Sequence, residues 1–471
     1  MHLLGIALTF ASQTSSKPDP AVTKAELEAD VRFLASDELQ GRSTGSPEAE
    51  KAAAWLAAEL ARAGIEPAGD GGTFLQAVPL HRMEAKSSPE LRLWTASGDK
   101  AAPFIAAVGR DYESVSTPVD LQDLEIVVAK TEAEIPRKAD PRKAILVDAF
   151  SLDAKRWLEA AGHAGGSGFG LWIQGGSKTP GEERVFKAGP VSGLARDADD
   201  ARPSALAIRV RGPLLDRLKK GEFARLSLAS HVERVPVRAS NVLGKIPGAG
   251  LPGKPEIAKE AIVVSAHYDH LPPSRSENEK DKIFNGADDD ASGCAAVLEI
   301  AGALAAGPKP ARTVVILLAT GEEEGLLGTD VYIEHPAVPL AATVANLNVE
   351  MIGRPDPLIG GAGQVWLTGF DKTDLGSTCA AKGIQLKPDP RLDQHFYERS
   401  DNFAFVMKKV VGQSFSTYNL HADYHRPSDE AATLDYAHME TATKTILEAV
   451  RLCADGSYRP GWTEESRAKP R

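Results

Sequence analysis

Cysteine is scarce in this chain of 471 residues. Only Cys294, Cys379 and Cys453 are present, and no two of them form a CxxC pair. Neither a zinc knuckle nor a disulfide framework is indicated, because both need cysteines paired at short or regular spacings. We therefore expect all three to be small buried apolar residues.

Basic side chains and long apolar runs are also in short supply. Lysine and arginine together number 54 against 65 aspartates and glutamates, which gives a formal net charge of -11. No basic stripe with interleaved aromatic residues occurs, so nucleic acid is not an expected partner. Beyond the N-terminus, no apolar run approaches about 18 residues, so we expect no transmembrane span.

The N-terminus resembles a targeting signal. Residues 1–12 contain a short apolar core without lysine or arginine, and a spacer rich in Ser, Thr and Pro continues to about Val22. We interpret residues 1–22 as a signal peptide with its spacer, and we expect the protein to be secreted or periplasmic. An internal start codon or a cytoplasmic tail is the alternative.

The length predicts two or three domains, or one large α/β unit with an insertion. Apolar spacing predicts helices at residues 25–35 and 47–63, with Ser46 as the N-cap of the second. Predicted strands at 241–246, 261–266, 313–319, 343–349, 364–367 and 410–416 alternate with predicted helices at 291–306, 326–335, 373–381, 400–406 and 432–453. This alternation predicts an α/β fold with a mainly parallel or mixed central sheet flanked by helices.

The middle of the chain has a different texture. Short β-rich runs and Gly/Ser-rich turns occupy residues 98–235, with one predicted helix at 153–161. We interpret this stretch as a smaller β-rich insert, which divides the main domain into residues 23–97 and 236–458. Residues 459–471 are predicted to be a disordered tail.

Acidic residues and histidines gather where three of the predicted strands end. His267 and Asp269 follow one strand, Glu322 and Glu323 the next, and Glu350 the third. Ligands of open α/β sheets bind outside the carboxyl ends of the strands, so the three ends could converge on one crevice. So many carboxylates would repel one another unless a cation neutralised them, and a metal site is therefore the first hypothesis.

Two of these clusters have plainer alternatives. His267 and Asp269 project to the same side of an extended chain, which suits a metal ligand with its orienting carboxylate, but a structural histidine is possible. The triplet Asp288, Asp289 and Asp290 precedes a predicted helix, where one aspartate could be a cap. A cap does not need three carboxylates, and an aspartate bridging two cations would explain the surplus.

The remaining candidates could supply acid–base chemistry. Glu322 and Glu323 point in different directions, so one could bind metal while the other acts as a general base. After the last predicted strand, Tyr424 could steady an oxyanion, His425 offers a second imidazole, and Asp429 could orient a ligand. Solvated surface loops are the alternative for both segments.

In chain order, these clusters resemble a known family, the secreted dinuclear-zinc metallopeptidases. The family includes bacterial leucyl-type aminopeptidases, glutamate carboxypeptidase II and, with loss of metal, the transferrin receptor. The resemblance covers about residues 240–454 and extends to residues 32–42. It implies a zinc aminopeptidase fold of the phosphorylase/hydrolase-like type, and the β-rich middle resembles the protease-associated (PA) insert of many members.

The resemblance implies a set of metal ligands. His267 would bind one zinc ion, Asp289 would bridge both ions, and Glu323 and His425 would bind the second. Glu350 stands where most members have Asp, so the carboxylate is retained with an altered reach. This departure leaves the identity and affinity of the first metal open.

The resemblance also implies catalytic roles. Glu322 matches the general base, Asp269 the carboxylate that orients the histidine ligand, and Tyr424 a transition-state hydrogen-bond donor. Arg399 and His395 resemble a segment near the substrate end of the cleft, where a structural salt bridge is the alternative.

The implied activity is that of a zinc-dependent exopeptidase with two Zn²⁺ ions per subunit, which removes N-terminal residues from peptide substrates. Three alternatives share the fold: a carboxypeptidase or dipeptidase, a receptor without catalysis, and a glutaminyl cyclase with a single zinc. The complete ligand set argues against the last two. Oligomeric state and the preferred side chain are not predicted.

Overall fold

The structure is a computed structural model that describes residues 22–95, 102–108, 110–112, 119–147, 169, 171–175, 193–196, 207–274, 280–464 and 466. The predicted helix at 153–161 and all but the last residue of the predicted signal segment lie outside this set. The chain divides into two compact units. One is Met1–Val78 with Arg238–Arg471, and the other is Pro79–Val237.

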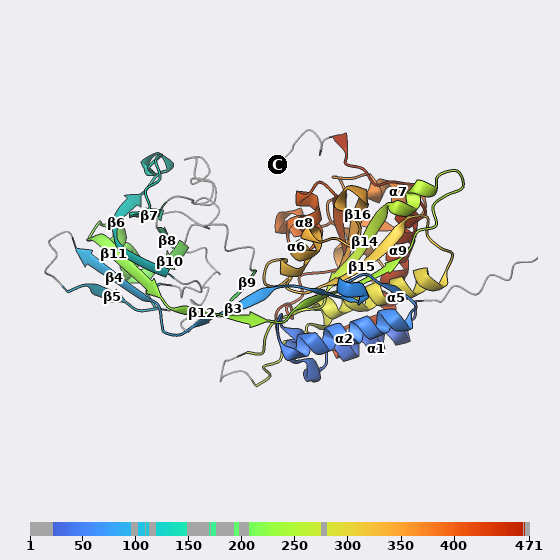
Figure 1. The fold of residues 1–471 in the computed structure, drawn as a ribbon, viewed down its shortest axis with the longest axis horizontal. Coiled ribbons are helices and arrows are strands. Elements are labelled where there is room, and N and C mark those ends of the chain that lie inside the picture. The colour runs from blue at the N-terminus through green and yellow to red at the C-terminus, as the bar shows by residue number, and fades with distance from the viewer. Residues whose placement is uncertain are drawn as a thin grey trace, which may run out of the picture. The chain divides into compact units, whose positions relative to one another are not determined.

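The first unit is built on a nine-stranded mixed sheet with the order β1, β13, β15, β14, β16, β19, β17, β18, and β2 paired with β13 (Figure 1). The strands are Glu66–Pro67 (β1), Leu75–Ala77 (β2), Ser240–Ile246 (β13), Ala261–His267 (β14), Thr313–Ala319 (β15), Thr343–Glu350 (β16), Val365–Leu367 (β17), Leu386–Pro388 (β18) and Val411–Ser416 (β19). The central strands β15, β14, β16 and β19 are parallel, whereas β13 and β17 run antiparallel to their neighbours β15 and β19. The predicted α/β class is confirmed.

Helices cover both faces of this sheet (Figure 1). Those of the larger layer are Lys24–Leu34 (α1), Pro47–Arg62 (α2), Gly293–Ala306 (α5) and Tyr436–Ala454 (α9); Leu327–Glu334 (α6) and Asn402–Met407 (α8) cover the other face, and Leu375–Ala381 (α7) follows β17. The side chain of Ser46 accepts a hydrogen bond from the Ala49 N–H, so the predicted N-cap of α2 is confirmed.

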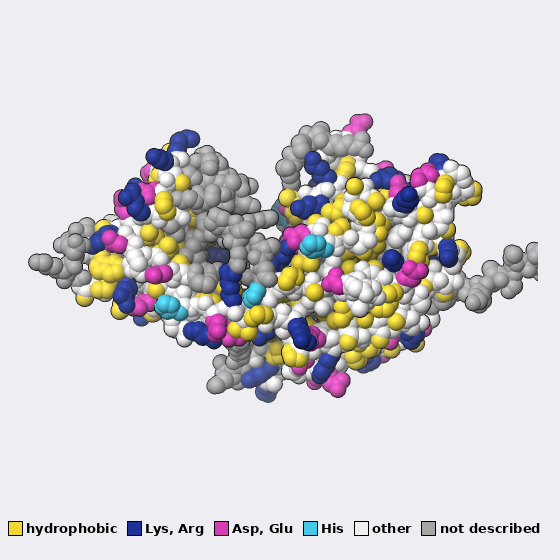
Figure 2. Space-filling view, viewed as in Figure 1, with side chains coloured by type: hydrophobic (Ala, Val, Ile, Leu, Met, Phe, Trp, Pro, Cys, Tyr) yellow, Lys and Arg dark blue, Asp and Glu magenta, His cyan; other side chains and the backbone are white. Residues whose placement is uncertain are grey.

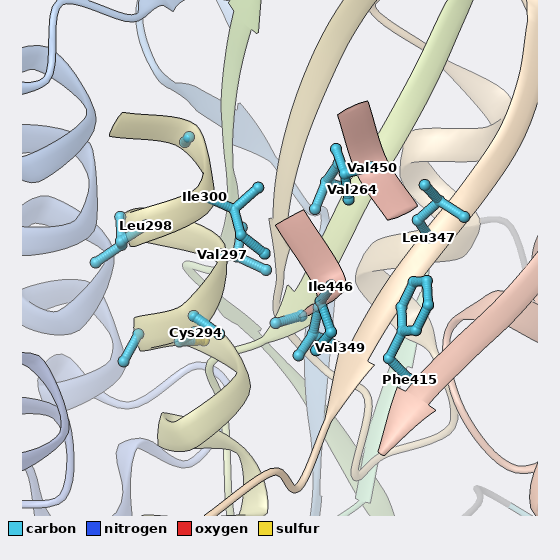
Figure 3. Close-up of a cluster of buried hydrophobic side chains, with 14 of the residues drawn as sticks. Val264, Cys294, Val297, Leu298, Ile300, Leu347, Val349, Phe415, Ile446 and Val450 are labelled. Carbon is cyan, nitrogen blue, oxygen red and sulfur yellow. The ribbon is translucent and has the colours of Figure 1, made fainter. Parts of the chain in front are cut away.

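The side chains of β14 alternate between two cores. Val264 packs in the core with α1, α2, α5 and α9, whereas Val263 packs in the core with α6 and α8. Figure 3 shows Val264 of β14 beside Val450 of α9, and Val349 of β16 beside Ile446 of α9. Burial on both faces explains why β14 and β15 are largely apolar. The same burial fixes where their carboxyl ends lie.

The acidic triplet delays the start of α5. Residues 287–292 form a π-helical turn, and Asp289 and Asp290 have non-helical backbone angles. The regular helix begins at Gly293 rather than at the predicted residue 291. The triplet is therefore a turn in its own right, which can direct its carboxylates away from the helix axis.

The second unit carries a seven-stranded sheet with the order β10, β8, β7, β6, β11, β4, β5, and a three-stranded sheet with the order β12, β3, β9. The strands are Leu80–Ala85 (β3), Glu90–Thr95 (β4), Phe104–Ala106 (β5), Val119–Ala129 (β6), Lys143–Val147 (β7), Leu171–Gly175 (β8), Gly193–Arg196 (β9), Ala207–Val210 (β10), Phe223–Ser230 (β11) and Val232–Val237 (β12), with one helix at Gly212–Lys219 (α4). This unit starts at Pro79, before the expected residue 98, because β3 and β4 pair with β12 and β11.

The expected tail is ordered at its beginning, which corrects the prediction for residues 459–463. Arg459 forms an ion pair with Glu260, and the Gly461 N–H donates to Asp374 Oδ1. Trp462 forms a β-bridge with Thr373 and packs against the larger core. An aromatic side chain that finds a core contact outweighs the polar composition that suggested disorder.

Charge on the visible surface is mixed. Lys/Arg and Asp/Glu side chains are interspersed over the face shown in Figure 2. No helix within the described ranges is both long and apolar enough to span a bilayer.

Arg42 joins the N-terminal helices to the loops of the sheet. Its side chain is fully buried and donates hydrogen bonds to the carbonyl oxygens of Leu34 (2.5 Å), Tyr268 (2.7 Å), Asn285 (2.7 Å) and Gly286 (3.1 Å). Two of these carbonyls immediately precede the acidic turn, and one lies just after β14. This contact explains why residues 32–42 belong with the distant catalytic half.

We predict that Arg42→Met lowers the free energy of unfolding by about 3 kcal/mol or more, because buried carbonyls left without a donor cost about 1–3 kcal/mol each. Urea unfolding measures the change. Arg32→Met is the matched control, since Arg32 pairs with Glu28 on an exposed helix face and such exposed pairs contribute little to stability. Equal effects of the two substitutions would contradict this role for Arg42.

Candidate metal centre

His267 is the last residue of β14 and is almost completely buried. Its Nδ1 lies 3.1 Å from the backbone oxygen of Asp269, and the Asp269 carboxylate is farther away, at 3.7 Å. That carboxylate instead accepts hydrogen bonds from Thr44 Oγ1 and the Glu322 N–H. The backbone carbonyl of Asp269 therefore orients the ring, and its carboxylate ties the His267 loop to the Glu322 loop.

Asp289 lies between two groups of side chains. Its Oδ1 is 3.3 Å from His267 Nε2, and its Oδ2 is 3.2 Å from His425 Nε2. The N–H groups of Asp288 and Asp289 both donate to Asp429 Oδ2, which holds the turn in place. Each oxygen of Asp289 thus faces a different imidazole, as a bridging carboxylate requires.

One group of potential ligands consists of His270, Asp289, Glu323 and His425, and their ligand atoms all lie within 4.8 Å of one another. Glu323 Oε1 is 2.8 Å from His270 Nδ1 and 3.3 Å from His425 Nε2. His270 was not among the ligands predicted from the sequence. Strand alternation would send it to the side opposite His267, but β14 ends at His267 and the turn that follows redirects it.

The second group consists of His267, Asp290 and Glu350, within the same 4.8 Å limit. Glu350 Oε1 is 3.3 Å from His267 Nε2, while its Oε2 accepts a hydrogen bond from Ser400 Oγ at 2.5 Å. Glu350 therefore reaches the His267 imidazole, although most members of the resembled family have aspartate at this position. Asp290 was not predicted; its Oδ1 accepts from the Gly293 and Met351 N–H groups.

Many polar atoms of these groups are buried without a hydrogen-bond partner. They are both ring nitrogens of His270, Asp289 Oδ2, Asp290 Oδ2, Glu323 Oε1 and His425 Nε2. Although His270 Nδ1 and Glu323 Oε1 are 2.8 Å apart, their geometry does not make a hydrogen bond. Buried polar atoms normally have hydrogen-bond partners, and these unpaired atoms lie in the two groups of potential ligands. Imidazole nitrogens and carboxylate oxygens in this arrangement fit divalent cations such as zinc.

The electrostatics point the same way. Burial would lower the pKa of His425, but its contacts with Asp289 and Glu323 outweigh burial and raise the pKa to about 10. Burial would raise the pKa of Asp289, but His267 and His425 hold it well below its usual range. Burial raises the pKa of Asp290 well above its usual range, and Glu350 adds to the effect. The carboxylates thus draw positive charge to the site, whether protons or metal ions.

Arg354 secures the loop that carries His425. Its guanidinium donates to Asp423 Oδ2 at 2.5 Å and to Asp429 Oδ1 at 3.1 Å. Asp423 lies two residues before His425, and Asp429 holds the acidic turn. Arg354 therefore links the loop that carries His425 to the turn that carries Asp289.

A cavity of about 270 Å³ opens beside both groups. Glu322 and Tyr424 line it, and the ring of Tyr424 stacks on His425 with centroids 3.9 Å apart. Burial is the main cause that raises the pKa of the Tyr424 phenol well above its usual value, so the hydroxyl keeps its proton. A carboxylate and a phenol hydroxyl thus face one space.

One part of the cavity wall is apolar. Met351, Trp366, Phe396 and Tyr418 form one small hydrophobic cluster, and all four line the cavity. Arg399 also lines it, with its guanidinium carbon 5.2 Å from the Phe396 ring centre. His395 does not line this cavity but a separate hollow beside Tyr397, so the structure separates two residues that the sequence grouped.

Part of this chain is similar in sequence to known proteins. The model of peptidase family M28 matches residues 241–450. A probable leucine aminopeptidase of Arthroderma benhamiae is 30% identical over 206 residues, which are 42% of this chain and 54% of that protein. A vacuolar membrane protease of Verticillium alfalfae is 33% identical over 208 residues, 43% of this chain and 18% of that protein. The chain thus spans about half the length of the probable leucine aminopeptidase.

Solved structures share the fold. The aminopeptidase from Aneurinibacillus sp. strain AM-1 superposes with a TM-score of 0.59 at 18% identity, covering 93% of this chain and 95% of that one. BSAP, a zinc aminopeptidase from Bacillus subtilis, gives 0.53 at 16% identity, with coverages of 95% and 97%. At these identities the likeness concerns architecture alone. Residues 241–450 of this chain are thus similar to peptidase family M28, and its fold resembles that of the two aminopeptidases.

Proposed function

We propose that this chain is a zinc-dependent exopeptidase that removes N-terminal residues from peptides, with two Zn²⁺ ions per subunit. The observation that carries the proposal is the pair of ligand groups on either side of Asp289, both beside the cavity. The match to peptidase family M28 and the similarity to a probable leucine aminopeptidase support the same activity. We further propose that the Pro79–Val237 unit is the PA-like insert and that the protein is exported.

The residues divide into binding and proton-transfer roles. His267, Asp290 and Glu350 would hold one ion, and Glu323 and His425 the other, with Asp289 between them. Bound zinc lowers the pKa of a water and polarises the scissile carbonyl.

Glu322 is the group best placed to accept a proton. Its carboxylate lines the cavity beside Glu350, and burial raises its pKa well above the usual range; His267 opposes the shift and Glu350 adds to it. A carboxylate whose pKa approaches the working pH serves well as a base and then as an acid towards the leaving amine. The Tyr424 hydroxyl would donate to the oxyanion.

The apolar wall supports an apolar N-terminal side chain. Trp366 and Phe396 stack with ring centres 5.6 Å apart, and Phe396 meets Tyr418 edge to face. A leucine or phenylalanine side chain against this wall would leave its α-amine on the side of Glu322 and Glu350, where negative charge favours the ammonium group.

A second candidate, a carboxypeptidase or dipeptidase of the same fold, is favoured by Arg399. No carboxylate within the described ranges forms an ion pair with its guanidinium, which lines the cavity. Such a cation could hold a substrate α-carboxylate.

Substrate panels decide between hydrolysis from the two ends. We expect turnover of leucyl- and phenylalanyl-p-nitroanilides, loss of turnover with a chelator, and recovery when zinc is added back. Acetylation of the substrate amine should abolish cleavage. Cleavage of an acetylated peptide at its C-terminus, with no action on the free aminoacyl anilides, would instead establish the second candidate.

Glu322→Gln tests the proposed base. We expect turnover of leucyl-p-nitroanilide to fall by about 10²–10⁴-fold, the usual contribution of general acid–base catalysis, with zinc content near that of the original chain. Metal analysis of the same samples checks the second point. Glu324→Gln, at an exposed position in the same acidic run, should leave both nearly unchanged. Full turnover by Glu322→Gln would refute the assignment.

Arg399→Gln separates the two candidates by binding. For an aminopeptidase we expect the KM for leucyl-p-nitroanilide to change by less than about threefold, because this substrate has no carboxylate for the guanidinium to hold. A carboxypeptidase would lose about tenfold or more in kcat/KM on peptides, the cost of a charge-assisted hydrogen bond of about 1.4 kcal/mol or more.

A further inference from the structure

The two ligand groups differ in their side chains, and one of them includes His270, which the family resemblance did not imply. With Asp289 shared, each offers four side chains, but one set contains two imidazoles, those of His270 and His425, and the other contains one, that of His267. We infer that His270 is itself a metal ligand, so that the site of Glu323 and His425 has two imidazole donors and binds its ion more tightly than the site of His267, which has one. This inference rests on the proposed metal content.

The surroundings of His270 leave its ring nitrogens without another role. The residue is 2% exposed, and neither Nδ1 nor Nε2 makes a hydrogen bond. Nδ1 lies 2.8 Å from Glu323 Oε1 and 3.9 Å from Asp289 Oδ2. A buried imidazole without any hydrogen bond is uncommon, and here it faces two carboxylates that also lack partners.

Packing holds the ring in this direction. The His270 and His425 rings meet edge to face with centroids 5.5 Å apart. On its other side, the ring lies against Gly286, where an added Cβ would be 2.6 Å from its Cγ and Cδ2. Gly286 also has a φ of +55°, which favours glycine. The backbone before the acidic turn therefore leaves room for this imidazole and aims it at Glu323.

The chemistry of the two sites should then differ. The His270 site offers two imidazoles and two carboxylates, whereas the His267 site offers one imidazole and three carboxylates. Imidazole nitrogen suits zinc and cobalt, whereas carboxylate oxygen suits harder cations. His270 is buried and does not line the cavity, although Glu323 of the same group does. Metal exchange should be slow at the His270 site and faster at the His267 site.

Cobalt binding to the full chain tests the inference without measuring activity. The metal-free protein is titrated with Co²⁺ against a competing chelator, and the visible spectrum is recorded after one and two equivalents. We expect two classes of site whose Kd values differ by about tenfold or more. His270→Ala should raise the lower Kd by more than about tenfold and change the first-equivalent spectrum, because a nitrogen donor is lost.

Matched variants isolate the effect. His438→Ala removes another buried imidazole, one bonded to the Gly363 N–H and Thr417, and should leave both Kd values unchanged. His267→Ala should abolish the weaker class only. If His270→Ala does not fold, as judged by circular dichroism, His270→Gln keeps most of the bulk and should show the same spectral change.

Two outcomes would overturn the inference. One is a tight Kd and a first-equivalent spectrum that both survive His270→Ala. The other is a higher Kd with an unchanged spectrum, which would make His270 a hydrogen-bonding neighbour of Glu323. Failure of the original chain to bind any metal would instead refute the proposed function.

Discussion

Carboxylates that meet at the carboxyl end of a buried parallel sheet cannot all remain ionised unless cations share the space. This constraint shapes the catalytic half. The strands that carry His267, Glu323 and Glu350 towards the site are buried on both faces, so their ends are fixed. Two arginines hold the connecting loops: Arg42 through backbone carbonyls and Arg354 through carboxylates. The rigid frame keeps the negative charges together, and bound metal ions would relieve their repulsion.

The fold was largely predictable because its signals are local. Apolar runs mark β14 and β15, and Ser46 with Pro47 marks the start of α2. The misses came from long-range contacts. Pairing of β3 and β4 with later strands moved the unit boundary to Pro79, and the contact of Trp462 with Thr373 ordered part of the expected tail.

The site was predictable as a set of strand ends but not in its details. Motif order brought together His267, Asp289, Glu323, Glu350 and His425, and the structure places all five around two centres. His270 and Asp290 were missed because both lie in turns, where no periodicity tells which way a side chain points. The role of the Asp269 carboxylate could not be predicted either, since it depends on the positions of Thr44 and the Glu322 backbone.

The central claim is that this acid-rich crevice holds two metal ions with Asp289 between them. Anomalous X-ray diffraction from crystals of the zinc-loaded protein, recorded on both sides of the zinc absorption edge, tests it most directly. The account predicts two peaks per chain, one next to His267 and Glu350 and one next to Glu323 and His425. A single peak, or none in the crevice, would contradict it.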